Sequence, residues 1–438
     1  APPPPSTAAS PSTSAASSTS TTPEAAEGRS ARAFTAVWLP SLVVIIGSGG
    51  CLFAVSWWVA LSPGGGASLG VVVGLSSMIS LVILTAVAGV LDRSDRTRTV
   101  ARLLLALAVP ITALIVVLGM RPQGVAIALA GACYLTITIF ESLYLATSET
   151  VAADLAPAHW PSARVALLTQ IHSQVERAIA PTLAGLVLAA DAVMAVPAAA
   201  LVLVLAMLVV ILLGRRHLDA VTQRTAANTG PAPRGVLRSV FADARSAIRL
   251  VRGSRALVFL VQLGILGNLI VFPFYAVLPA YLTEFVDGPA ELALWYGRAA
   301  TAYGLGMLAG TLVLVQIKRN LGGDRALLAA SGALAVICLV LIGGSATSIP
   351  AVVVGMMAVN GALFAVMVAV GGAVWLDHTP SEVRVRVFAL RRLTVFSSIP
   401  VGTMLMGFGG TAVGYRTFTT GLAVFVIVVL TAAWVRYR

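Results

Sequence analysis

The stretch AGVLDRSDRTRTVAR, residues 88 to 102, places a dense run of charges between two long apolar segments, at about 68 to 91 and 99 to 119. Each segment supplies the roughly 20 mostly apolar residues that a helix needs to cross a bilayer. A short charged turn between two such segments predicts a pair of antiparallel membrane helices whose connecting turn lies on one side of the membrane.

The rest of the chain repeats this alternation of apolar segments and short polar turns. Of its 438 residues, 58% are hydrophobic and only 11% are charged, which is more apolar surface than one soluble core could hide. The sequence therefore predicts an all-α polytopic membrane protein with twelve transmembrane helices. Their approximate ranges are 36–60, 68–91, 99–119, 123–147, 163–189, 193–214, 256–282, 293–317, 325–343, 349–376, 387–410 and 417–436.

The net charge of +12 would suggest nucleic acid as the partner of a soluble protein, but here the basic residues fall in alternate loops. One set of loops holds Arg93, Arg96, Arg98, Arg102, nine Arg between 215 and 255, Lys318, Arg319, Arg325, Arg384, Arg386, Arg391 and Arg392, and the other set holds only Arg121, Arg298 and Arg416. By the positive-inside rule we expect a multi-pass plasma membrane protein with both termini cytoplasmic. We expect the lipid bilayer, and not nucleic acid, as its surroundings.

The domain plan follows from the longest polar interruption, at 215–255, which divides the helices six and six. We expect an N-terminal bundle at 35–214 and a C-terminal bundle at 256–438. Residues 1–34 form a Pro, Ser, Thr and Ala tract that predicts a disordered cytoplasmic tail. In the linker, apolar residues at helical spacing alternate with Arg, which favours a basic amphipathic helix on the inner leaflet. A solvated linker is the alternative.

The two halves echo each other at one helix junction. Asp154 and Pro157 follow the fourth predicted helix, and Asp377 and Pro380 follow the tenth, each pair three positions apart. Arg384 and Arg386 follow the second pair. This echo indicates a pseudo-two-fold parallel repeat, with two related six-helix bundles about an axis normal to the membrane.

The stretch at 88–102 is similar to the cytoplasmic signature of the major facilitator superfamily, and the resemblance covers about 36 to 436. The residues that match are Asp92, Arg93, Arg96 and Arg98, whereas Ala88 replaces the first Gly, with Gly89 beside it, and Asp95 replaces the second. The form D-R-x-D-R resembles the branch of macrolide and siderophore (enterobactin) exporters, as do ADLAPAHWPSARVALLTQIHSQVERAIAPTLAGLVLA and TPSEVRVRVFAL, which begin at 153 and 379.

The resemblance implies a cytoplasmic gate around Asp92. A carboxylate there faces the positive end of the helix at 387–410 and nearby Arg side chains. A charged turn that only sets the topology is the alternative. The expected gate residues are Gly89, Asp92, Arg93, Arg96, Arg98, Arg391 and Arg392.

The helix at 163–189 carries ionisable residues deep in the membrane. At ~1.5 Å per residue, His172 lies roughly 14 Å in, and Glu176 and Arg177 roughly 20 Å in. A charge facing lipid there costs at least ~2.5 to 3.5 kcal/mol, so these residues should face a cavity or a partner. Glu141 lies near the depth of His172. His172 and Glu176 stand four residues apart on one helix, so their side chains are within hydrogen-bond reach. We expect Glu141, His172, Glu176 and Arg177 to form a proton relay. A static ion-pair network is the alternative.

The same helix continues with Ala180, Pro181, Ala184 and Gly185, which resemble an eroded form of the superfamily's antiporter motif, Gly-Pro-x-x-Gly-Gly. In the family this motif goes with export. Generic packing of small residues is the alternative.

The C-terminal half has aromatic and amide side chains within its predicted helices and no deep acid. Such surfaces suit a bulky amphipathic ligand. Trp57 and Trp58 are expected to belong to an interface belt. The possible substrate contacts, including two from the helix at 163–189, are Gln170, Gln174, Gln262, Asn268, Phe272, Tyr275, Tyr303 and Asn360.

These features predict a secondary transporter that couples proton entry to efflux of a drug, natural product or siderophore by alternating access. A lipid or lysolipid flippase, a proton-symport importer and a non-transporting sensor are the alternatives. The sequence has no H-E-x-x-H motif, no G-x-S-x-G motif with catalytic partners and no phosphate loop. We therefore expect no enzymatic activity, no metal and no cofactor, with the proton gradient as the energy source, and no obligate protein partner.

Overall fold

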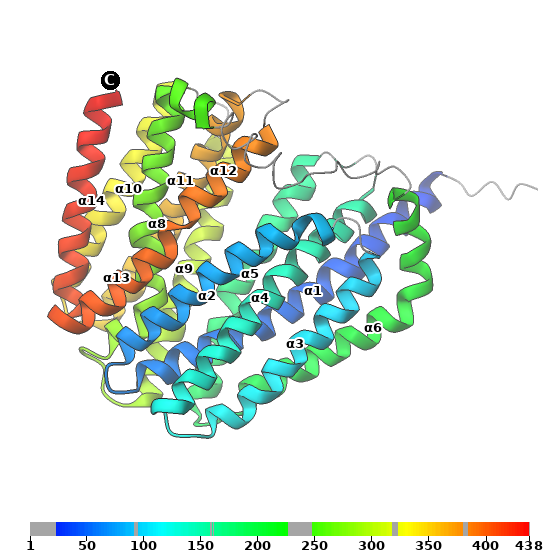
Figure 1. Ribbon diagram of the computed structural model, residues 1–438, viewed down its shortest axis with the longest axis horizontal. Coiled ribbons are helices and arrows are strands. Elements are labelled where there is room, and N and C mark those ends of the chain that lie inside the picture. The colour runs from blue at the N-terminus through cyan, green and yellow to red at the C-terminus, as the bar shows by residue number, and fades with distance from the viewer. Residues whose placement is uncertain are drawn as a thin grey trace, which may run out of the picture.

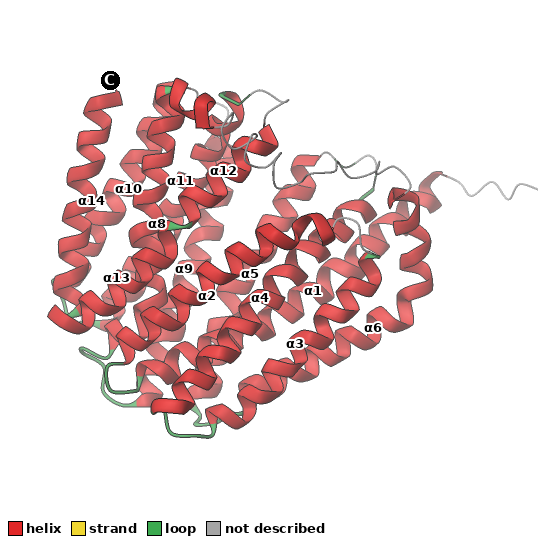
Figure 2. Cartoon of the chain, viewed as in Figure 1, coloured by secondary structure: helices red, strands yellow, loops and turns green. Residues whose placement is uncertain are grey.

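A computed structural model describes residues 23–91, 95–157, 160, 162–226, 248–317, 323–379 and 384–437. Over these ranges the chain is helical, with short turns between the helices and no strand (Figure 2). The all-α prediction is confirmed.

The helices form two sets that lie next to each other in Figure 1. The start of α1 and the end of α14 lie at the same edge of the molecule, here called the terminal end, and the other edge is called the opposite end. The N-terminal bundle consists of α1 (Pro23–Ala60), α2 (Gly65–Leu91), α3 (Arg96–Leu118), α4 (Gly124–Leu155), α5 (Ser162–Ala189) and α6 (Ala195–Ala226). The C-terminal bundle consists of α8 (Arg255–Leu282), α9 (Pro289–Ile317), α10 (Gly323–Ser345), α11 (Pro350–Asp377), α12 (Arg384–Phe396), α13 (Ser398–Val413) and α14 (Tyr415–Tyr437).

Ten spans among the described residues are long and apolar enough to cross a membrane, and α12 and α13 together supply one of them. The two long helices outside this set are α5 and α9, which pack against each other between the bundles. Burial against a partner removes their polar side chains from lipid, where such groups are costly. With α5 and α9, the helices supply the twelve predicted crossings.

Two helices extend beyond their predicted limits. Helix α1 begins at Pro23, so residues 23–34 of the predicted disordered tail lie in a helix, and residues 1–22 lie outside the described residues. Proline fits the first position of a helix. Helix α6 runs to Ala226, past the predicted boundary at 214, because residues 215–226 contain no Gly or Pro. The predicted amphipathic helix lies mostly outside the described residues, which resume with a helical segment at 248–253.

The helix predicted at 387–410 is interrupted at Ser397, between α12 and α13. Pro400 has no backbone N–H, so it cannot donate to the carbonyl four residues earlier. The neighbouring carbonyl of Val395 accepts from Ser398 Oγ at 2.6 Å and from Asn268 Nδ2 at 3.1 Å. Side chains of α13 and α8 therefore donate to a main-chain carbonyl next to the break.

Glycines let the two bundles approach closely where helices cross. A Cβ on Gly407 of α13 would lie 2.8 Å from Gly70 Cα of α2, and one on Gly185 of α5 would lie 3.1 Å from Gly297 Cα of α9. Such contacts, under 3.4 Å, are closer than ordinary side chains allow, so small residues are required here. The bundles thus touch through two glycine crossings, α2 with α13 and α5 with α9.

Hydrogen bonds add to these crossings toward the opposite end. Thr182 and Thr301 hydroxyls lie 2.6 Å apart, and Trp57 Nε1 donates to the Pro289 carbonyl at 3.1 Å. Trp57 and Trp58 are both buried, so the predicted interface belt is wrong for this pair. Contacts between the bundles thus occur at the opposite end and near the middle of the molecule.

Candidate functional site

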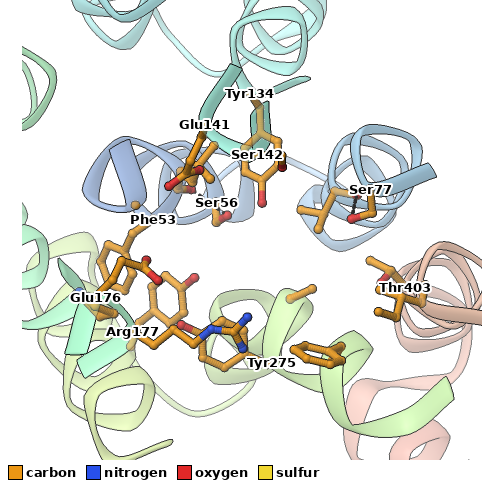
Figure 3. A pocket seen from close by; sticks show the side chains of 18 of the residues that line it. Phe53, Ser56, Ser77, Tyr134, Glu141, Ser142, Glu176, Arg177, Tyr275 and Thr403 are labelled. Atoms are coloured by element: carbon orange, nitrogen blue, oxygen red, sulfur yellow. Dashed lines mark hydrogen bonds between the residues drawn. The ribbon is translucent and has the colours of Figure 1, made fainter. Parts of the chain in front are cut away.

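A cavity of about 350 Å³ lies between the two bundles near their middle. We call it the acid chamber. Figure 3 shows Glu141 of α4 and Glu176 and Arg177 of α5 extending toward a common space, with Tyr275 and Thr403 on other sides of it. Its walls are Gly49, Leu52, Phe53, Ser56, Val73, Ser77, Tyr134, Glu141, Ser142, Leu145, Glu176, Arg177 and Pro181 from the N-terminal bundle, and Phe272, Tyr275, Ala276, Tyr296, Ile399 and Thr403 from the C-terminal bundle.

Helix α1 supports both carboxyl groups of this chamber. Ser48 Oγ donates to Glu141 Oε1 at 2.8 Å. The next residue, Gly49, leaves the space that the Glu176 carboxyl group occupies, since a Cβ on Gly49 would collide with Glu176 Oε1. The structure therefore brings Glu141 of α4 and Glu176 of α5 into one cavity, as their depth predicts.

Arg177 also lies on the wall of the acid chamber, but it points to an aromatic ring. Its Cζ lies 5.3 Å from the centroid of Phe272, on α8 of the other bundle. In the described part of the chain, the side-chain ion pair within 4.0 Å joins Arg98 to Asp95, and none involves Arg177. Glu141, His172, Glu176 and Arg177 form no ion pair with one another in this structure. The alternative interpretation, a static ion-pair network, requires such pairs.

His172 lies apart from the other three predicted relay residues. It is buried against α1, with its ring 5.4 Å from that of Trp38 and its Nε2 3.4 Å from Ser41 Oγ. Its Nδ1 has no hydrogen-bond partner among the described residues, so the predicted bond to Glu176 is absent. His172 stands one turn nearer the terminal end than Glu176, where Trp38 and Ser41 lie against it.

A second cavity, of about 190 Å³, borders the acid chamber. We call it the aromatic chamber. The two chambers share Arg177 and Phe272, which both cavities include in their walls. The other residues that line the aromatic chamber are Gln174, Leu260, Leu263, Gly264, Asn268, Met307, Phe364, Ala365, Met367, Val368, Gly371, Trp375, Arg391, Val395 and Phe396.

The predicted substrate contacts divide between the two chambers and the surrounding core. Phe272 and Tyr275 line the acid chamber, and Gln174 and Asn268 line the aromatic chamber. Gln174 Nε2 also donates to Thr311 Oγ1 of α9 at 2.9 Å.

Three of the predicted contacts that the structure describes do not line either chamber. Tyr303 is buried behind Tyr275, with ring centroids 5.0 Å apart, and Asn360 is buried in α11. Gln262 lies on the exposed face of α8. The side chain of Gln170 lies outside the described residues. Helical position alone could not separate the faces that line cavities from the faces that pack.

The antiporter-like motif presents two faces. Ala180 and Ala184 lie near α1, where a Cβ on Gly49 would be 3.4 Å from Ala180 Cβ. Pro181 and Gly185 lie near α9, where a Cβ on Gly297 would be 3.0 Å from the Pro181 carbonyl oxygen. The motif therefore fits α5 between one helix of its own bundle and one of the other bundle.

Most of the predicted cytoplasmic gate cannot be compared with the structure. Asp92, Arg93 and the side chain of Arg96 lie outside the described residues, and Gly89 lies near the end of α2. Asp95 caps α3, since its Oδ1 accepts from the Arg98 N–H at 3.1 Å, and it also pairs with the exposed Arg98 side chain at 2.9 Å. This capping role explains an acid where the family has Gly.

The basic residues of α12 have different surroundings. Arg391 Cζ lies 5.5 Å from the ring centroid of Trp375 and 5.6 Å from that of Phe388, whereas Arg392 is exposed. At the repeat junctions, Pro157 is buried and Asp377 ends α11. Pro380 and the side chains of Asp154, Arg384 and Arg386 lie outside the described residues.

Several residues of the chamber wall, and Ser48 beside it, were not anticipated from the sequence. Phe53 stacks on Tyr296 with centroids 4.0 Å apart and joins the bundles at the acid chamber. Ser48 and Gly49 belong to the run GSGG at 47–50, whose small residues signal close helix contacts. Tyr134 and Thr403 carried no local signal. Among the described residues, no cluster of three or more His, Cys, Asp or Glu could hold a metal.

Comparisons with known proteins identify the fold. The sequence model of the transmembrane secretion effector family, which belongs to the major facilitator superfamily, matches residues 28–438. A bacterial homologue of the iron transporter ferroportin, in its inward-facing state, has a TM-score of 0.66 at 15% identity and covers 93% of this chain and 98% of that one. The nucleoside transporter NupG has a TM-score of 0.67 at 14% identity, with 92% and 99% covered.

A third solved structure gives the same result. A bacterial homologue of the human lysosomal transporter Spinster, inward-facing and unoccupied, has a TM-score of 0.64 at 13% identity, with 94% of this chain and 98% of that one covered. A search of the curated proteins finds no match. At these identities the likeness shows the fold alone, which confirms the predicted pair of six-helix bundles.

Proposed function

The chain belongs to the transmembrane secretion effector family of the major facilitator superfamily, and we propose that it is a proton-coupled exporter of bulky amphipathic small molecules. It would work by alternating access, with the substrate between the bundles and the proton gradient as its energy source.

The observation that carries this proposal is the presence of Glu141 and Glu176 in one cavity between the bundles. A buried carboxylate without a paired cation is costly, so such a group readily exchanges its charge for a proton. Protonation changes the charge that faces the cavity, and a ligand or proton that prefers one conformation shifts the population toward it. Two acids at this place are suited to couple proton binding to the movement of the bundles.

The proposed orientation places the terminal end in the cytoplasm. The basic residues favour this orientation by the positive-inside rule. The glycine crossings and the Trp57 to Pro289 hydrogen bond tie the bundles together from the middle to the opposite end. In this orientation the contacts fit an inward-facing state, in which substrate enters from the cytoplasm.

The proposed substrate class rests on the walls of the two chambers. Phe272, Tyr275 and Tyr296 give the acid chamber an aromatic surface opposite its carboxyl groups. Aromatic walls with few polar groups bind ligands mainly through area, and together the chambers offer the volume of a drug-sized molecule. The resemblance to macrolide and siderophore exporters supports the same class.

A flank groove supports a second candidate, a lipid flippase. This groove has a volume of about 590 Å³ between α2 and α4 and reaches Phe408 of α13. Its walls are mostly apolar, with Ser68 and Ser76 among them, and would accept an acyl chain. Because Phe408 belongs to the other bundle, the groove would change shape as the bundles move.

The test is uphill uptake of lipophilic dyes and siderophores into inverted vesicles with an acidic lumen. We expect the wild type to accumulate a subset of the panel, and Glu176→Gln and Glu141→Gln to lose accumulation by at least about tenfold. Glu149→Gln is the matched control, because Glu149 lies on the same helix as Glu141 but outside both chambers. Full accumulation in both chamber variants would contradict proton coupling at this site, and movement of labelled lipid without dye uptake would favour the flippase.

A further inference from the structure

The wall between the two chambers is made by one residue of each bundle. Arg177 of α5 and Phe272 of α8 are the two residues common to the walls of both cavities. The guanidinium group lies over the ring at 5.3 Å, within the range of a cation–π contact. Where they meet, this contact separates the acid chamber from the aromatic chamber.

The aromatic chamber extends from this wall toward the terminal end. Helix α8 lines it from Leu260 to Phe272, which corresponds to about 18 Å at the rise of an α-helix. Trp375 and Arg391 line it near the terminal ends of α11 and α12. A molecule that moves from this chamber across the shared wall to Glu141 and Glu176 passes Arg177 and Phe272.

Arg177 has competing partners on the two sides of the wall. On one side is the Phe272 ring, and on the other are the carboxyl groups of Glu141 and Glu176, which line the same acid chamber without forming an ion pair to it. The other titratable side chains around Arg177 are Tyr134, Tyr275 and Tyr296 on the wall of the acid chamber, Tyr303 behind Tyr275, and Arg391 on the wall of the aromatic chamber. An ionised carboxylate binds guanidinium far more strongly than a ring does, whereas a protonated carboxyl group does not.

We propose that Arg177 is a proton-operated door between the chambers. When Glu141 and Glu176 are protonated, the guanidinium group stays over Phe272 and closes the passage. When they ionise, it turns toward the carboxylates and opens the passage. The proposal rests on the proposed function, since it assigns the acids a proton-binding role.

The door makes entry of the substrate into the acid chamber depend on the release of protons. In an inward-facing protein, release of protons would open the acid chamber to a substrate that waits in the aromatic chamber. Proton binding would close it, so protons and substrate would compete without sharing a contact. Competition of this kind suits exchange of the two across the membrane.

The test measures access to a thiol placed on each side of the door. Thr403→Cys reports on the acid chamber and Ala365→Cys on the aromatic chamber, because each residue lines one of them. The purified protein is treated with a polar methanethiosulfonate reagent across the pH range in which it stays folded. The ratio of the two modification rates removes the part of the rise of thiolate reactivity with pH that both sites share.

We expect the ratio of acid-chamber to aromatic-chamber labelling to rise by about tenfold from low to high pH. Glu141→Gln with Glu176→Gln should hold the ratio low at every pH, and Phe272→Leu should hold it high, whereas Phe272→Tyr should restore the dependence. A ratio that is flat in the wild type, or that responds to pH equally in the Phe272→Leu protein, would overturn the door. No substrate or gradient is used, so failure here is distinct from failure of the vesicle uptake test.

Discussion

The interiors of the two bundles differ although their architecture repeats. In the N-terminal bundle, buried or cavity-facing positions hold Glu141, His172, Glu176 and Arg177. The corresponding region of the C-terminal bundle presents aromatic rings, and Arg391 packs on two of them. The helix crossings between the bundles are nevertheless alike, since each consists of close glycine contacts.

This difference indicates a division of work between the repeats. Carboxyl groups in one bundle supply sites whose charge depends on proton binding, and rings in the other supply area for an apolar substrate. The two functions meet where Arg177 lies over Phe272. Substitutions in the two bundles should therefore have different kinetic signatures, while substitutions at the shared crossings should abolish movement altogether.

The largest effect is expected at a crossing that both bundles need. In Gly297→Leu, the added side chain would meet the Pro181 carbonyl oxygen and Gly185 Cα, which belong to the backbone of α5. Overpacking of this kind costs about 1–3 kcal/mol and would separate α5 from α9. We expect transport to be lost and the thermal unfolding midpoint to fall, measured by vesicle uptake and by melting of the purified protein.

Gly355→Leu is the matched control for this crossing. Gly355 is exposed on α11, and a Cβ added there meets no atom within 4 Å. It should transport and melt like the wild type. Equal loss in both variants would show that the crossing of α5 and α9 has no special role.

A smaller effect, on substrate affinity, is expected from the aromatic bundle. Tyr275→Leu removes a ring from the acid chamber that also packs against Tyr303. Loss of aromatic contact is worth about 0.5–1.5 kcal/mol, so the KM for a transported dye should rise up to about tenfold while the maximal rate changes little. Concentration dependence of initial uptake rates would measure this split. A fall in maximal rate at constant KM would instead assign Tyr275 to the coupling step.

A partial effect is expected from the hydrogen bond that supports one acid. Ser48→Ala removes the donor to Glu141 Oε1. A hydrogen bond to a charged group is worth about 1.5–3 kcal/mol, so the ionised form of Glu141 becomes less favourable. We expect the pH profile of uptake to move to higher pH, because a carboxylate without its donor binds protons more readily. Ser56→Ala removes a hydroxyl of the same chamber wall that donates to the Leu52 carbonyl, and should leave the profile in place.

The smallest effect on transport is expected at His172. Its substitution distinguishes the observed geometry, in which His172 lies apart from the two acids, from the predicted proton relay, in which His172 takes part. His172→Gln keeps a polar side chain against Trp38 and Ser41, outside both chambers. Uptake should stay within about twofold of the wild type, with a loss of stability of about 1 kcal/mol. If uptake falls as far as in Glu176→Gln, His172 takes part in proton transfer after all.

The sequence predicted the overall architecture and three of the four residues at its polar centre. Apolar length fixed the number of crossings, and the cost of charge in lipid forced Glu141, Glu176 and Arg177 toward a shared interior. His172 also avoids lipid, but it does so by packing against α1. Depth and helical periodicity cannot distinguish a side chain that packs against a helix from one that faces a cavity. Side chains from other elements decide between these outcomes.

Other differences between the prediction and the structure arose at local sequence signals that a prediction from apolar periodicity does not use. Pro23 marks the start of α1, and Pro400 marks the interruption between α12 and α13. Trp57 looked like an interface residue by its place near a helix end, but its indole N–H reaches α9 of the other bundle. Contacts between the two bundles could not be read from either repeat alone.

The most direct test compares energised and energy-independent transport in one protein. The double variant Glu141→Gln with Glu176→Gln and the wild type are reconstituted with a dye that the wild type accumulates. Dye exchange without a gradient and uptake driven by an acidic lumen are then measured side by side. We predict that the double variant loses driven accumulation and that its remaining exchange no longer depends on pH. Driven accumulation equal to that of the wild type would contradict the assignment of proton coupling to the acid chamber.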